Sequence, residues 1–278
     1  MSSGRLSLVF WEVRKILRKK ESYLFLIMVL IPVLYGIGFA SGSDSFIYRG
    51  TEPMSCLRWV QTIFVMVQQF LIFHIALVIV VVRALSSEIE DRSILLYIPR
   101  VNSRARIFRT KILAVVRYGL LGMALLVVVG VATYYLFMIN VPEVASGVPW
   151  VSGDMPTAVL VIGLIVLGFL VAAFIGLLLA SYLKPLLAIA VGVVALIVMA
   201  LCGQLPVVAY LTPQFYLTRL QDLWQASGAR GDSVGNPSLV LFTSDPWVVA
   251  LLGAGVSVVT MGICYWIGLR HFERRDLG

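Results

Sequence analysis

Six long apolar runs limit what this chain can fold into. A helix needs about 20 predominantly apolar residues to cross a hydrocarbon core of about 30 Å. Each run is continuously apolar and lacks the period of two that a membrane β-strand shows. The predicted spans are residues 22–40, 59–82, 118–139, 158–182, 186–208 and 247–269. The sequence therefore predicts an all-α integral membrane protein with six transmembrane helices in a single domain, residues 1–278.

The overall composition agrees with a membrane protein. Of 278 residues, 60% are hydrophobic and 13% are charged, whereas soluble domains are about half apolar and a quarter charged. The first apolar run exceeds the roughly 7 to 15 residues of a cleavable signal peptide, so we expect it to be a retained span.

The distribution of basic residues predicts the topology. The chain has 22 lysines and arginines and a net charge of +8. Only four lie in segments predicted to be on the outer side of the membrane: Arg49, Arg58, Arg219 and Arg230. The other eighteen precede the first span, follow the last, or lie in the connections after the second and fourth spans. This asymmetry predicts cytoplasmic termini, and it explains the positive charge without a nucleic-acid partner.

Residues 1–20 are predicted to form an amphipathic helix in the membrane interface. One helical stripe is apolar: Leu6, Val9, Phe10, Val13, Ile16 and Leu17. Arg14, Lys15, Arg18 and Lys19 occupy the other side, as in helices that lie in the interface plane. The alternative is a positively charged anchor with no partner.

A second amphipathic helix is predicted in the outside loop, residues 209–246. Tyr216, Leu220, Leu223 and Trp224 recur at spacings of three and four residues. We expect this short helix to lie on the outer surface of the membrane or to dip partly into it.

Small residues recur every fourth position along the fourth span, at Gly168, Ala172, Gly176 and Ala180. This spacing lets helix backbones approach closely in lipid. It favours packing within the chain, and a subunit interface is the alternative.

Recognisable catalytic and metal-binding patterns are missing. HExxH, GxSxG and the phosphate-binding GxxxxGK[ST] do not occur. Cys56, Cys202 and Cys264 have neither disulfide nor zinc spacing and are expected to be unpaired. We therefore expect no enzyme activity, cofactor or metal in this chain, so a second polypeptide would have to hydrolyse any ATP used.

Three polar residues within the second span are candidates for a transport pathway. At 100° per residue, Gln61 and Gln68 fall on one helical face and His74 falls on another. The glutamines are possible pathway-lining residues. His74 is predicted to be a hydrogen-bonded packing residue, with a proton carrier as the alternative.

The connection after the second span, residues 83–117, carries the most charge. Hydroxyl and acidic residues from Ser86 onwards favour a helix start, and a second, basic helix start is predicted at residues 103–111. The segment is either a solvated cytoplasmic loop or a docking surface for a soluble motor.

Specific residues of this loop resemble a known family. The type-two (ABC-2) permeases of ATP-binding cassette transporters carry E-x-E-x-G-[TS]-L followed by P-V-S-R and a lysine. The matching positions are Glu88, Glu90, Ser93, Ile94, Ser103, Arg104 and Lys111. The ending HFERRDL, residues 271–277, is similar to the family's F-x-R-R-D close. Arg92 and Val101 replace the usual glycine and proline.

This resemblance implies the permease subunit of an exporter in a prokaryotic plasma membrane. It implies a second permease chain, identical or homologous, and separate ATPase subunits that bind ATP and Mg²⁺. The N-terminal helix and the coupling loop, residues 83–117, would contact the ATPase. The expected ATPase-coupling residues are Glu88, Glu90, Ser93, Arg104 and Lys111. The alternatives are a non-transporting membrane binding or immunity protein, and a membrane-embedded enzyme of unrecognised type.

Overall fold

The fold is all-helical over the residues that the computed structural model describes: 3–42, 53–91, 103–141, 144–151, 155–205, 208–228 and 245–274. The helices are α1 (Ser3–Leu17), α2 (Leu24–Ala40), α3 (Cys56–Gln69), α4 (Ile72–Glu90), α6 (Arg104–Leu136), α7 (Met155–Tyr182), α8 (Pro185–Cys202), α9 (Pro213–Gly228) and α10 (Pro246–Arg274). Short 3-10 helices are η1 (Lys20–Tyr23), η3 (Met138–Asn140) and η4 (Ala209–Leu211). The predicted all-α class is confirmed.

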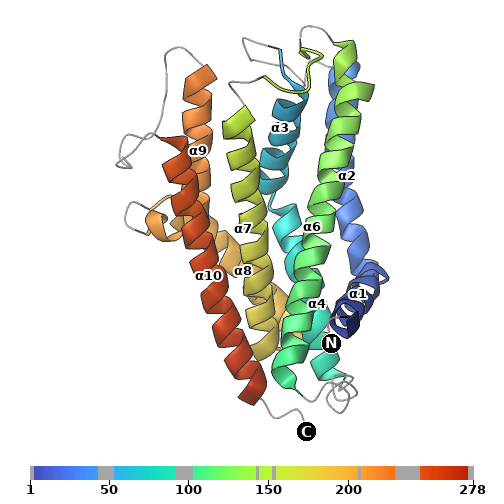
Figure 1. Cartoon of the computed structure of the whole chain (residues 1–278), viewed down its shortest axis with the longest axis vertical. Coiled ribbons are helices and arrows are strands. Elements are labelled where there is room, and N and C mark those ends of the chain that lie inside the picture. The colour runs from blue at the N-terminus through green and yellow to red at the C-terminus, as the bar shows by residue number, and fades with distance from the viewer. Residues whose placement is uncertain are drawn as a thin grey trace.

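Six of these helices are long and apolar enough to cross a membrane, which confirms the predicted number and indicates a multi-pass membrane protein. They are Lys20–Ala40, Ile72–Glu90, Arg104–Asn140, Met155–Tyr182, Pro185–Cys202 and Pro246–Arg274. The N-terminus, α1 and the last turn of α10 lie at the same end of the bundle, at the bottom of Figure 1. We call this the lower end.

The second predicted span is not one continuous helix. α3 ends at Gln69 and α4 begins at Ile72, and between them Leu71 has a left-handed backbone with φ 51°. This conformation costs a non-glycine residue about 1–2 kcal/mol, and neither glycine nor proline marks the break in the sequence. Favourable packing next to the break offsets the cost, because Phe73 is fully buried with its ring centroid 4.2 Å from that of Phe169.

The predicted coupling loop is largely helical where it is described. α4 continues through Ser86 to Glu90, so the helix start predicted at Ser86 is wrong: this segment extends an existing helix. The second predicted start is confirmed, since the Ser103 side chain caps α6 by accepting a hydrogen bond from the Arg106 backbone amide at 3.4 Å.

The region after α8 also differs from its prediction. α8 ends at Cys202, so the fifth span is shorter than the predicted 186–208. The predicted amphipathic helix forms as α9, and it runs lengthwise beside α10 (Figure 1). Phe215, Tyr216 and Leu220 of α9 are buried, and Tyr216 lies against Gly253 of α10.

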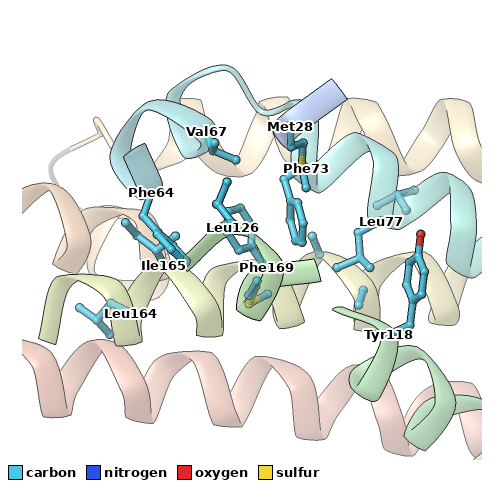
Figure 2. Close-up of a cluster of buried hydrophobic side chains, with 14 of the residues drawn as sticks. Met28, Phe64, Val67, Phe73, Leu77, Tyr118, Leu126, Leu164, Ile165 and Phe169 are labelled. Carbon is cyan, nitrogen blue, oxygen red and sulfur yellow. The ribbon is translucent and has the colours of Figure 1, made fainter. Parts of the chain in front are cut away.

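One hydrophobic core joins the helices, with α7 packed against α4 on one side and α10 on the other. Figure 2 shows side chains from five helices meeting there: Met28 of α2, Phe64 of α3, Phe73 of α4, Leu126 of α6 and Phe169 of α7.

Three of the four small residues predicted to allow close packing, Ala172, Gly176 and Ala180, are buried within the chain, whereas a Cβ at Gly168 would meet nothing within 4 Å. Ala172 and Ala180 are fully buried, and a Cβ at Gly176 would lie 3.4 Å from the Val78 backbone in α4. This close approach supports the intrachain interpretation of the small-residue spacing.

Replacing Gly253 by alanine should destabilise the bundle, because the new Cβ would lie 2.7 Å from Tyr216 Cβ and 3.1 Å from a Leu164 methyl group. Overpacking of this kind costs about 1–3 kcal/mol. Gly262→Ala in the same helix is the matched control, since that Cβ meets nothing within 4 Å. Thermal unfolding of the purified variants measures the difference, and equal midpoints would contradict the described α7–α9–α10 packing.

Candidate functional site

Four charged side chains meet between α1, α4 and α6 at the lower end of the bundle. Lys111 Nζ lies 2.5 Å from Glu12 Oε2 and 2.7 Å from Glu88 Oε2. The other oxygen of Glu88 accepts a hydrogen bond from Lys15 Nζ. We call Glu12, Lys15, Glu88 and Lys111 the charge cluster. Its two carboxylates balance its two ammonium groups.

Three members of the charge cluster are buried. The side chains of Glu12, Glu88 and Lys111 are 7%, 5% and 3% exposed, whereas that of Lys15 is 41% exposed. Removing a charge from water costs several kcal/mol, and close pairing with complementary charges offsets this cost. Glu12 and Lys15 of α1 pair with Lys111 of α6 and Glu88 of α4, so the complete set of ion pairs forms only when the three helices lie together.

The local sequence explains how these side chains meet. Val9, Val13 and Ile16 are buried on the face that α1 turns to the bundle, and Glu12 is buried with them because positions three and four apart share a face. Glu88 is in the last turn of α4, and Lys111 is in the third turn of α6.

Further polar contacts extend from the charge cluster along the connection between α1 and α2. Lys19 Nζ donates to the backbone carbonyl of Arg83 at 2.9 Å, and Glu21 lies 3.8 Å from the Arg83 guanidinium. Burial lowers the pKa of the Lys19 ammonium, and the nearby Glu88 carboxylate opposes this shift. The segment that leads into the first span is therefore tied to the end of α4.

The structure brings together two of the five predicted coupling residues, Glu88 and Lys111, which form an ion pair. Glu90 is exposed at the end of α4, and Arg104 begins α6, where its guanidinium donates to the Glu273 carbonyl at 3.2 Å. Ser93 lies outside the described residues. Direct contact of these side chains with an ATPase stays a prediction.

Sequence reasoning did not identify Glu12 and Lys15 as site residues. One signal was present, since Glu12 falls among the apolar positions of α1, where an acid needs a buried partner. The partner could not be inferred, because Lys111 is 99 residues away.

The predicted C-terminal motif packs against the same end of the bundle as far as it is described. His271 stacks on Tyr182 with ring centroids 3.7 Å apart, and Phe272 is fully buried with its ring 5.4 Å from that of Phe108. The motif therefore joins the end of α10 to α6 and α7. Residues 275–278 lie outside the described part.

The candidate pathway residues Gln61, Gln68 and His74 are all buried. Gln68 Nε2 donates to Gln214 Oε1 at 2.9 Å, which links the end of α3 to the start of α9. Neither amide atom of Gln61 has a hydrogen-bond partner among the described residues. Whether the glutamines line a pathway stays a prediction.

His74 packs as predicted, with its ring centroid 4.5 Å from that of Phe169. Its Nδ1 has no hydrogen-bond partner in the described part of the chain, and the hydrogen bonding predicted for His74 stays a prediction.

A polar pocket of about 420 Å³ lies near the junction of α8 and α9. Its polar lining comes from Gln204, Gln214, Thr218, Arg219 and Asp222. Gln214 also accepts a hydrogen bond from Gln68, so one hydrogen bond links the pocket lining to the end of α3, next to the break before α4.

The described residues contain no disulfide, since all three cysteines are free, and no group of three or more metal-binding side chains. The cysteine prediction is confirmed. Comparison with protein-family models, curated proteins and solved structures found no match.

Removing the central charge should strongly destabilise the protein. Lys111→Met leaves two carboxylates buried beside each other, and breaking a buried ion pair from one side costs about 3–5 kcal/mol. The free energy of unfolding in detergent measures this loss.

Two controls separate charge burial from loss of the lysine itself. Lys184→Met removes an exposed lysine and should change stability by no more than about 0.5 kcal/mol. Adding Glu12→Gln and Glu88→Gln to Lys111→Met removes both buried carboxylates and leaves only Lys15 charged, at a side chain 41% exposed to water, so most of the lost stability should be restored. A triple variant as unstable as Lys111→Met would mean that packing, not charge, dominates at this position.

Proposed function

We propose that this chain is the membrane-spanning permease subunit of an ATP-binding cassette exporter. It works with a second permease chain and with separate ATPase subunits that bind ATP and Mg²⁺. The observation that carries the proposal is the charge cluster, which ties α1, α4 and α6 together at the lower end of the bundle. The resemblance of residues 88–111 to the coupling loop of type-two permeases supports it.

The charge distribution supports a cytoplasmic location for the lower end. The basic segments that predict this topology include α1, the start of α6 and the end of α10. In the proposed topology, the C-terminal end of α4 and the N-terminal end of α6 flank residues 92–102 in the chain, on the side where an ATPase would bind.

The proposed mechanism depends on the rigidity of α4 and α6. Docking of the ATPase displaces the exposed ends of these helices when nucleotide binds, and the charge cluster transmits the displacement to α1. α4 then carries it over 19 residues, about 28 Å, to the break at Leu71. The break and the nearby Gln68–Gln214 hydrogen bond provide an element with two arrangements that the nucleotide can bias.

The distinction between Glu88 and Glu90 gives the proposal a sharp test. Glu88 is buried in the charge cluster, so its replacement perturbs folding, whereas Glu90 is exposed and available to a partner. Glu90→Lys should leave the unfolding temperature unchanged. It should also reduce the effect of the permease on ATPase turnover about tenfold, as expected when a charge-assisted contact worth about 1.4 kcal/mol is lost.

The experiment purifies the tagged chain from the membranes of its own cells in mild detergent. We expect an ATPase with a phosphate-binding loop to co-purify, and its turnover to depend on the permease. Asp245→Lys is the matched control, because it reverses an exposed acid just before α10, at the other end of that helix from its last turn, and lies outside the lining of the polar pocket. Recovery of the chain without any ATPase would reject the proposed function and favour a non-transporting membrane protein.

A further inference from the structure

A groove of about 540 Å³ separates part of α1 from α6. Two arginines line it, Arg14 of α1 and Arg117 of α6, and both are exposed. Its apolar lining includes Phe10, Leu17, Leu120 and Leu121. No acidic side chain of the described residues lines the groove. The groove therefore combines a purely cationic polar part with apolar walls.

The arginine and the two leucines that α6 contributes to the groove lie at different predicted depths in the membrane. The predicted hydrocarbon span begins immediately after Arg117, so the guanidinium lies at the level expected for lipid head groups. Leu120 and Leu121 follow by three and four residues, about 5–6 Å deeper into the apolar layer. α6 has 33 residues, about 50 Å, so its first turns extend below a hydrocarbon core of about 30 Å.

We propose that this groove is a binding site for an acidic phospholipid of the cytoplasmic leaflet. Arg14 and Arg117 contact the phosphate, because guanidinium groups form paired hydrogen bonds with phosphate oxygens. The acyl chains lie against the leucines and Phe10. An anionic lipid matches the groove's charge, since a zwitterionic head group would bring an ammonium group to a site with no acid to receive it.

The site would regulate how firmly α1 is held on the bundle. Arg14 lines the groove, while the neighbouring residues Glu12 and Lys15 belong to the charge cluster. A lipid bridging Arg14 and Arg117 joins α1 to α6 outside the cluster and stabilises the same helix contact. This inference goes beyond the proposed transport function, and lipid binding is measured on the chain alone, without an ATPase.

The test measures binding of phosphatidylglycerol and phosphatidylcholine to the full chain in a maltoside detergent, by native mass spectrometry. We expect phosphatidylglycerol to bind more tightly and to raise the unfolding temperature more. Each arginine near a membrane surface contributes about 1 kcal/mol toward anionic lipid. Arg14→Gln and Arg117→Gln should therefore each weaken binding of this lipid about fivefold, and the double variant about thirtyfold.

Arg106→Gln is the matched control, because it removes an exposed arginine from α6 that does not line the groove. This variant should bind phosphatidylglycerol like the unchanged chain. If the double variant does not fold, the two single variants still measure the contribution of each arginine. Unchanged affinity in Arg14→Gln and Arg117→Gln, or equal binding of the two lipids, would overturn the proposal.

Two further arms test other occupants of the groove. Glycerol 3-phosphate, which has the anionic group without acyl chains, should bind far more weakly than phosphatidylglycerol, and equal affinity would assign the groove to a soluble anion. Leu121→Cys, made without the native cysteines, should not form a disulfide between two chains. Its formation would assign the groove to a second copy instead.

Discussion

The cost of burying charge organises the lower end of this protein. Lys111 has almost no access to water and contacts two carboxylates that are nearly as buried. Separating α1 from α4 and α6 would break the Glu12–Lys111 and Lys15–Glu88 ion pairs, and the buried carboxylate of Glu12 would lose its partner. Hydrophobic contact alone would let α1 slide on the bundle, because apolar packing is non-directional. Ion pairs specify one register for α1, as the proposed transmission of a displacement to this helix requires.

The second predicted span is interrupted farther up the bundle, at Leu71. α3 and α4 share no continuous backbone hydrogen-bond ladder across Leu71, so the second predicted span consists of two helices. α4 has its lower end fixed by Glu88 and its upper end at this break. Gln68, which bonds to Gln214, places a polar contact beside the break. In the proposed mechanism, α4 connects the charge cluster at its lower end to this break at its upper end.

Sequence periodicity predicted the helical class and the number of spans because continuous apolar runs have few other structural solutions in a membrane. It failed at Leu71, where no glycine or proline signals the break and the conformation depends on tertiary packing of Phe73. Glu88 and Lys111 were identified by the family resemblance and not by periodicity. Neither signal predicted the ion pair between them or the contribution of Glu12, because these side chains are distant in sequence and meet only in the folded bundle.

The two faces of α1 explain why a short helix outside the spans can affect the whole chain. Its buried face carries Glu12, whose charge is balanced only within the bundle. Phe10 and Leu17 are largely exposed although they belong to the predicted apolar stripe, so the bundle covers only part of that stripe. In the predicted interfacial position of α1, lipid would cover the rest. The position of α1 would therefore depend on both the bundle and the lipid. A lipid that bridges Arg14 and Arg117 would favour the arrangement in which the ion pairs of the charge cluster are formed.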